Sequence, residues 1–139
     1  MSAATADDGV VVLDSLAALR SARETLPRPL GLVPTMGNLH EGHLELVRRS
    51  RARDAATVVS IFVNPLQFGP GEDFERYPRT FAEDRALLAA SGVAAIFCPT
   101  VQELYPQGLE AHTRVAVPGL SDVLEGASRP GPFDGVTTV

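Results

Sequence analysis

Cysteine, tryptophan and long apolar runs are scarce in this chain. Cys98 is the only cysteine among 139 residues, and there is no tryptophan. A single cysteine excludes a disulfide within the chain and fits a reducing compartment, so we expect a cytoplasmic protein. No apolar run approaches the roughly 18 residues that a membrane-spanning helix needs. Residues 1–9 are small and acidic and lack the layout of a signal peptide, which predicts a flexible N-terminal tail.

Basic residues are also fewer than acidic ones. Lys and Arg number 12 against 17 Asp and Glu, which gives a formal net charge of −5. This balance argues against a nucleic acid or an anionic membrane as the partner, although a local anion site remains possible. Hydrophobic residues make up 45% and charged residues 21%, as in ordinary soluble globular proteins. The length suffices for one domain with a real core, which we place at residues 10–139.

Apolar runs and helix signals alternate along the first hundred residues. The predicted strands are 30–33, 57–63 and 93–98, and the predicted helices are 16–25, a segment that ends near Arg53, and a segment that ends at Ser91. Ser15 can cap the first helix, Thr80 with Glu83 forms a capping-box pattern, and Gly92 ends the last helix. This order predicts an α/β fold, with a parallel sheet, flanking helices and right-handed crossovers.

The pattern weakens after Pro99. We predict a helical turn at 101–104, an extended edge at 113–117, a short helix at 121–124 and a loop at 126–135. Residues 136–139 begin another apolar segment directly after that loop. We therefore expect this chain to be part of a longer protein.

The most informative stretch is Pro34-Thr35-Met36-Gly37-Asn38-Leu39-His40-Glu41-Gly42-His43, between the first strand and the next helix. His40 and His43 are three residues apart and share one helix face. Unpaired N–H groups and the dipole favour an anion at a helix start, and imidazoles there can donate to phosphate oxygens. A surface pair without function is one alternative. A metal site is another, although Glu41 lies on a different face and His112 is the only other histidine.

A second polar group follows the second strand, in Asn64-Pro65-Leu66-Gln67-Phe68-Gly69-Pro70. In a parallel sheet Asn64 and Gln67 would share a rim with the two histidines. Their amides offer donors and acceptors suited to a small hydroxy acid. The alternative is that Asn64 stabilises the turn before Pro65 and that Gln67 is solvated.

These strings resemble a known family. His40-Glu41-Gly42-His43 is similar to the His-x-Gly-His signature of nucleotidyltransferases, and the longer string that begins at Pro34 resembles the pantothenate synthetase (pantoate–β-alanine ligase) family. Three further segments also resemble the pantothenate synthetase family: Ile61 to Gly69, Asp73-Phe74 with Tyr77 to Thr80, and Gly119 to Gly126. The resemblance spans residues 30–139 and implies the N-terminal portion of a Rossmann-like, nucleotidyltransferase-type fold.

The resemblance implies an ATP- and Mg²⁺-dependent ligase that condenses pantoate with β-alanine through a pantoyl adenylate, releasing pyrophosphate and AMP. It makes His43 the proton donor, with His40 assisting. The implied ATP-binding residues are Met36, Gly37, Asn38, Leu39, His40, Glu41, Gly42 and His43. Gln67, Met36 and Asn64 would bind pantoate or β-alanine, and no residue is assigned to a metal.

Two departures from the family stand out. Pro132 occupies a position where the family usually has a histidine. Family members are also longer, and their Gly-x-Lys-Asp segment, second pantoate-binding glutamine and Ser-Ser-Arg segment are absent here. The resemblance therefore implies an apparently truncated catalytic domain, from a family of homodimers, that carries half of the site. The alternative is a non-catalytic module that binds nucleotide or pantoate.

Overall fold

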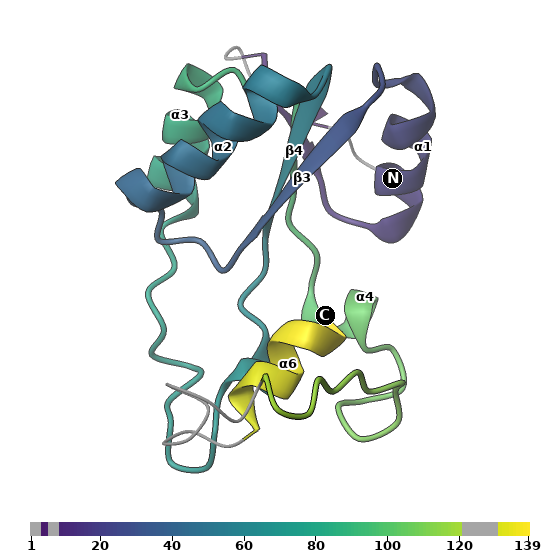
Figure 1. The fold of residues 1–139 in the computed structure, drawn as a ribbon, viewed down its shortest axis with the longest axis vertical. Helices are drawn as coiled ribbons and strands as arrows, with labels where there is room; N and C mark the ends of the chain where they lie inside the picture. Colours follow the sequence, from purple (N-terminus) through teal and green to yellow (C-terminus); the bar gives the residue numbers. More distant parts are fainter. Residues whose placement is uncertain (1–3, 6–8, 121–130) are drawn as a thin grey trace. The chain divides into compact units, whose positions relative to one another are not determined.

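The computed structural model describes residues 4–5, 9–120 and 131–139. The chain forms two compact units, shown in Figure 1. We call them the first unit (Met1–Phe62 with Pro78–Thr100) and the second unit (Val63–Tyr77 with Val101–Val139). The sequence pattern predicted a single domain over residues 10–139 and did not indicate this division.

The first unit contains the parallel sheet that the sequence predicted. Its strands are β1 (Ala4–Thr5), β2 (Val11–Leu13), β3 (Leu30–Thr35), β4 (Ala56–Ile61) and β5 (Ala95–Phe97). They lie in the order β1-β2-β5-β4-β3, with β1 antiparallel to β2 and the other neighbours parallel. Ala4 pairs with Val12, so two residues of the segment 1–9 form strand β1, and the prediction of an N-terminal tail over 1–9 stays a prediction.

Strand β4 lies at the centre of the parallel part of the sheet. Val59 pairs with Val33 of β3 on one side and with Ile96 of β5 on the other, and all three side chains are buried. Figure 1 shows helices α2 (Glu41–Arg53) and α3 (Phe81–Ala90) on one side of the sheet and α1 (Leu16–Thr25) on the other. A strand covered on both faces needs an apolar, β-branched sequence, as β4 has.

Strand β3 is two residues longer than predicted. The prediction ended at Val33, the last residue of the apolar run, and the next residue, Pro34, has no N–H to donate to a neighbouring strand. Here β3 is the edge strand of the described sheet, so Pro34 pairs with Ser60 without depriving a second neighbour of a hydrogen bond. This extension brings Thr35 to the end of the strand, directly before the His-x-Gly-His turn.

The helix ends agree with the sequence signals in one case and differ in another. Ser15 caps α1 as predicted, with the Ala18 N–H donating to its Oγ at 3.1 Å. Thr80 precedes α3, but it forms no capping box with Glu83. Its hydroxyl instead donates to Asp84 Oδ2 at 3.2 Å, because a buried carboxylate is a strong acceptor that needs donors.

The second unit corrects several predictions. Its described elements are η1 (Pro65–Gln67), a 3₁₀ turn inside the predicted loop, the predicted helical turn α4 (Val101–Leu104) and α6 (Pro132–Thr138). Residues 113–117 form no strand: the N–H of Val115 donates to Thr138 Oγ1 at 3.0 Å, and its carbonyl accepts from the same hydroxyl. The predicted helix at 121–124 and residues 126–130 of the predicted loop lie outside the described residues.

Helix α6 replaces the end of the predicted loop. Pro132 is buried at its first position, where a missing N–H is tolerated.

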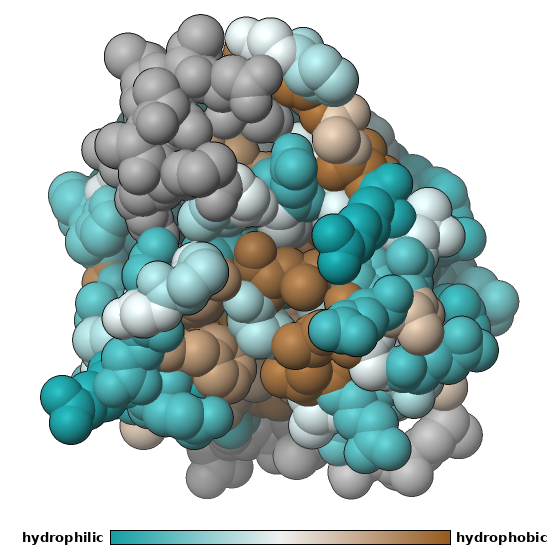
Figure 2. All heavy atoms as spheres, turned by 90° about the horizontal axis from the view of Figure 1, so that it is seen from below, coloured by the Kyte–Doolittle hydropathy of each residue, from teal (hydrophilic) through white to brown (hydrophobic). Residues whose placement is uncertain are grey.

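Figure 2 shows a face of the molecule with apolar side chains exposed among polar ones. In the second unit Leu120, Val136 and Val139 expose 69%, 49% and 55% of their surface. No helix in the described part of the chain is long and apolar enough to cross a membrane.

Gly135 of α6 packs directly against the backbone of η1, and there is no space for a side chain at this position. A Cβ at this buried position would lie 2.3 Å from the carbonyl oxygen of Leu66 and 2.8 Å from the backbone nitrogen of Gln67. Backbone atoms cannot rotate away as a side chain can, so one of the two elements would have to move.

We expect Gly135→Ala to lower the free energy of unfolding of the second unit by about 1–3 kcal/mol, although alanine favours a helix. Urea titration followed by tyrosine fluorescence measures this, because the only tyrosines, Tyr77 and Tyr105, lie in the second unit. Val136→Ala is the matched control in the same helix, since Val136 is exposed and its truncation should change stability by only about 0.5 kcal/mol. Equal effects of the two substitutions would contradict the packing argument.

Candidate functional site

The turn after β3 is anchored at its start by Thr35. The Thr35 hydroxyl donates to the Ser60 carbonyl at 2.8 Å, and its oxygen accepts the N–H of Gly37 at 3.1 Å. Gly37 has φ +78°, and a Cβ there would lie 3.1 Å from both Asp84 Oδ2 and Ile61 Cγ2. Glycine is therefore required here for its backbone conformation and for its small volume.

The next two residues of the turn are held by α3. Asp84 is only 2% exposed and accepts the N–H of Asn38 on Oδ2 and the N–H of Leu39 on Oδ1, both at 2.9 Å. Asn38 has φ +51°, a conformation that residues other than glycine seldom adopt. The carboxylate thus stabilises an otherwise unfavourable turn by pairing two of its amides.

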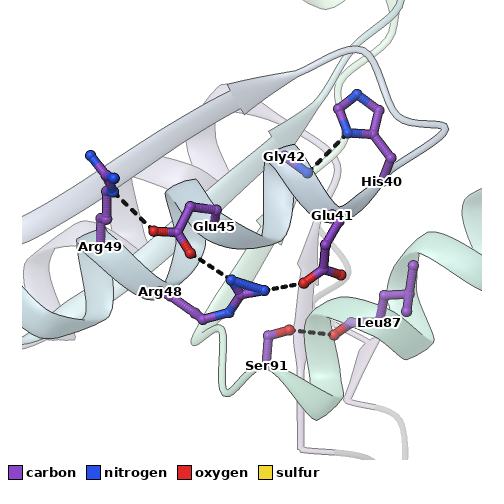
Figure 3. A network of polar contacts seen from close by, with 8 residues as sticks. All are labelled: His40, Glu41, Gly42, Glu45, Arg48, Arg49, Leu87 and Ser91. Atoms are coloured by element: carbon purple, nitrogen blue, oxygen red, sulfur yellow. Dashed lines mark hydrogen bonds and ion pairs between the residues drawn. The ribbon is translucent and has the colours of Figure 1, made fainter.

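His40 and His43 meet at the start of α2, as the spacing predicted. His40 is the N-cap residue: its Nδ1 accepts the N–H of Gly42 at 3.1 Å, which Figure 3 shows. The N–H of His40 in turn donates to His43 Nδ1 at 3.2 Å, and the ring centroids are 4.0 Å apart. Since both Nδ1 atoms accept, each neutral ring carries its proton on Nε2. The pair therefore offers two Nε2–H donors at a helix N-terminus, where an anion is favoured.

The protonation of His43 is shifted toward the neutral form. Partial burial lowers its pKa below the ordinary value of 6.5, and the neighbouring His40 lowers it further, while Asp84 acts in the opposite direction. At neutral pH His43 is thus a neutral hydrogen-bond donor that can still take up a proton when negative charge approaches.

The outer face of α2 carries ion pairs. Glu41 pairs with Arg48, and Glu45 pairs with both Arg48 and Arg49, as Figure 3 shows. These groups are largely exposed, so the pairs contribute little to stability and form a solvated face. The carboxylate of Glu41, in the predicted ATP-binding string, is turned to Arg48. Among the described residues no group of three or more histidine, cysteine or acidic side chains could hold a metal ion.

In the second unit Asn64 lies at the centre of a hydrogen-bond network. Its Nδ2 donates to Gln67 Oε1 at 3.2 Å and to the Gly135 carbonyl at 3.0 Å, and its Oδ1 accepts from the Leu66 N–H and the Tyr105 hydroxyl. The side chain is 1% exposed, and its amide uses two donors and two acceptor sites. Asn64 therefore holds the side chain of Gln67 in place through its Oε1 atom.

The structure brings His40 together with His43, and Asn64 together with Gln67. The two pairs belong to different units, so their convergence on one site stays a prediction. Sequence reasoning missed Asp84 and Tyr105. Asp84 had a usable signal, because it lies four residues before the buried Leu88 on the inner face of α3, and a carboxylate on a buried face needs partners. Tyr105 had no such signal.

We expect His43 to titrate below pH 6.5 in an NMR titration and His40→Gln to raise its midpoint, because that variant removes one of the two causes that lower the pKa. Below pH 6.5 the unfolded chain binds more protons at His43 than the folded chain does. The stability that neutral His43 contributes is therefore lost as pH falls from 6.5 toward the pKa of the folded state. Arg53→Gln, at the far end of α2, is the control. An unchanged or lower His43 midpoint in His40→Gln would contradict the assignment.

Residues 11–139 match the family model described as pantoate-beta-alanine ligase. The chain is similar to the pantothenate synthetase of Hydrogenovibrio crunogenus, with 55% identity over 134 residues, which cover 94% of this chain and 47% of that protein. Among solved structures it is similar to pantothenate synthetase from Thermus thermophilus, with 54% identity and a TM-score of 0.82 over 91% of this chain and 45% of that one.

A further similar structure is the pantoate-beta-alanine ligase of Francisella tularensis complexed with beta-gamma ATP and beta-alanine. It shares 36% identity and a TM-score of 0.82, over 91% of this chain and 49% of that one. The chain spans about half the length of the relatives that it matches. The resemblance inferred from the motifs is confirmed, and the chain belongs to the pantoate-beta-alanine ligase family.

Proposed function

We propose that this chain carries the nucleotide- and pantoate-binding part of an ATP-dependent pantoate–β-alanine ligase. The reaction condenses (R)-pantoate with β-alanine through a pantoyl adenylate and releases pyrophosphate and AMP. The observation that carries the proposal is the family match over residues 11–139, which includes the paired histidines at the start of α2. A homodimer and a cytoplasmic location belong to the same proposal.

The segment Met36 to His43 would bind ATP. The helix N-terminus and two Nε2–H donors suit the phosphates, whose charge increases on the leaving pyrophosphate. A Cβ at Gly42 would lie 2.9 Å from the His40 ring, so glycine suits the contact between that ring and the Gly42 N–H. The small residue would also permit close approach of the nucleotide. His43 would act as the proton donor and His40 as its partner. Both stabilise charge without forming a covalent bond, since phosphoryl-group displacement needs positioning more than a protein nucleophile.

Mg²⁺ would be held mainly by the phosphate oxygens, because the described residues contain no ready-made group of three ligands. The ion would supply additional neutralisation of phosphate charge. The F. tularensis relative was solved with an ATP compound and β-alanine, which supports ATP and β-alanine as ligands here.

Gln67 would bind pantoate through its amide nitrogen, with Met36 lining the pocket. Asn64 would act mainly by holding Gln67, since its own amide atoms are engaged in hydrogen bonds within the second unit. In this role Asn64 would not need to touch the substrate, whereas Gln67 would.

The test is pyrophosphate release by the full 139-residue chain with ATP, Mg²⁺ and pantoate, measured with and without β-alanine. We expect release that requires pantoate and falls by about 10²-fold or more in His43→Ala, a usual loss for a proton-transfer group. Gln67→Ala should mainly raise the KM for pantoate. Arg53→Ala, exposed at the end of α2, is the matched control and should retain the parent rate.

Pyrophosphate release that does not depend on pantoate would contradict the ligase proposal. No release from a folded chain would leave the family membership standing but would show that this chain is not catalytic by itself. Binding of ATP or pantoate without release would support the alternative of a non-catalytic binding module. That alternative draws on the observation that the chain spans 47% of its H. crunogenus relative.

A further inference from the structure

We propose that Asp84 is a positioning residue for the nucleotide, fixing the turn before α2 so that both histidines face the ligand in one geometry. The inference rests on the proposed nucleotide function of that turn. It assigns a role to a residue on a different helix, in none of the motifs that identify the family.

The geometry gives Asp84 three partners from two parts of the chain. Asn38 and Leu39 donate their backbone N–H groups to its two oxygens, and the Thr80 hydroxyl donates to Oδ2 at 3.2 Å. The carboxylate is 2% exposed, so these donors replace nearly all of the water that an exposed carboxylate would bind. A buried charge with fixed donors holds them in a narrow range of positions.

The middle of the turn has a backbone conformation that is unfavourable without a partner for its amides. Gly37 and Asn38 have φ values of +78° and +51°, and Asn38 and Leu39 come directly before the N-cap His40. The position of His40 sets that of His43, because the His40 N–H donates to the His43 ring. Asp84 therefore acts on both imidazoles through the backbone. The charged or titratable groups that influence His43 are His40 and Asp84 itself, and the negative charge of Asp84 favours the imidazolium form.

A purely structural role would affect stability alone. Asp84→Asn distinguishes the two roles, because it keeps the shape of the side chain but removes the charge and turns an NH₂ group toward one of the two amides. We expect three changes in the folded variant: a lower titration midpoint of His43, at least tenfold faster hydrogen exchange at Asn38 and Leu39, and about tenfold weaker binding of ATP with Mg²⁺.

Two matched variants serve as controls. Thr80→Val removes a donor to the same carboxylate but leaves the turn amides paired. Asp54→Asn removes a partly buried carboxylate of the same unit that bonds to Ser50. In both variants the ATP affinity should stay within about twofold of the parent value. The titration midpoint of His43 should stay within about 0.2 pH units of the parent value. An Asp84→Asn chain that folds and keeps parent values in all three measurements would overturn the proposal.

If Asp84→Asn does not fold, the parent chain decides. Binding of ATP with Mg²⁺ should slow hydrogen exchange at Asn38 and Leu39, because a nucleotide held on this turn keeps both amides bonded to Asp84. Exchange at these two amides that bound ATP leaves unchanged would overturn the proposal. None of these readouts needs turnover, so a failure of the ligase assay and a failure of this inference are distinguishable.

Discussion

Burial of strand β4 is the constraint on which the first unit depends. The strand pairs with parallel neighbours on both sides and is covered by helices on both faces, so its sequence must be apolar almost throughout. The polar residues of β4, Thr57 and Ser60, lie next to its two ends. Thr35 is the last residue of β3, and its hydroxyl ties the following turn to Ser60 of β4. The sheet therefore provides a fixed base for the turn that carries the histidines.

Each unit uses one buried polar side chain to hold an irregular segment. Asp84 pairs the amides of the β3–α2 turn in the first unit, and Asn64 pairs with η1, α6 and Tyr105 in the second. Both side chains are almost inaccessible to solvent. An irregular segment cannot satisfy its own backbone groups as a helix or strand does, so a side chain must do so, and a buried one does it with the greatest precision. The more exposed residues beside them, His40 and Gln67, are held in place by these buried neighbours.

The two imidazoles show how local contacts select a chemical state. Each Nδ1 accepts a backbone N–H, which leaves Nε2–H as the donor of each neutral ring, and burial with a neighbouring imidazole disfavours the charged form of His43. A neutral donor binds phosphate oxygens without the cost of desolvating a full charge, and it can take up a proton as negative charge develops. The carboxylate of Asp84 opposes this shift, so the balance depends on two elements that are distant in the sequence.

The sequence by itself determined the elements whose signals are local. The helix after Ser15, the buried strand near Val59 and the pairing of His40 with His43 follow from spacing and periodicity, and the motif strings led to the family. The tertiary structure decided what depends on distant partners. Pro34 stays within a strand because β3 is at an edge, Asp84 accepts the amides of the distant β3–α2 turn, and Asn64 is enclosed by Gly135 and Tyr105. The physical reason is that a local pattern records which groups need partners, whereas the fold alone determines which groups from elsewhere in the chain supply them.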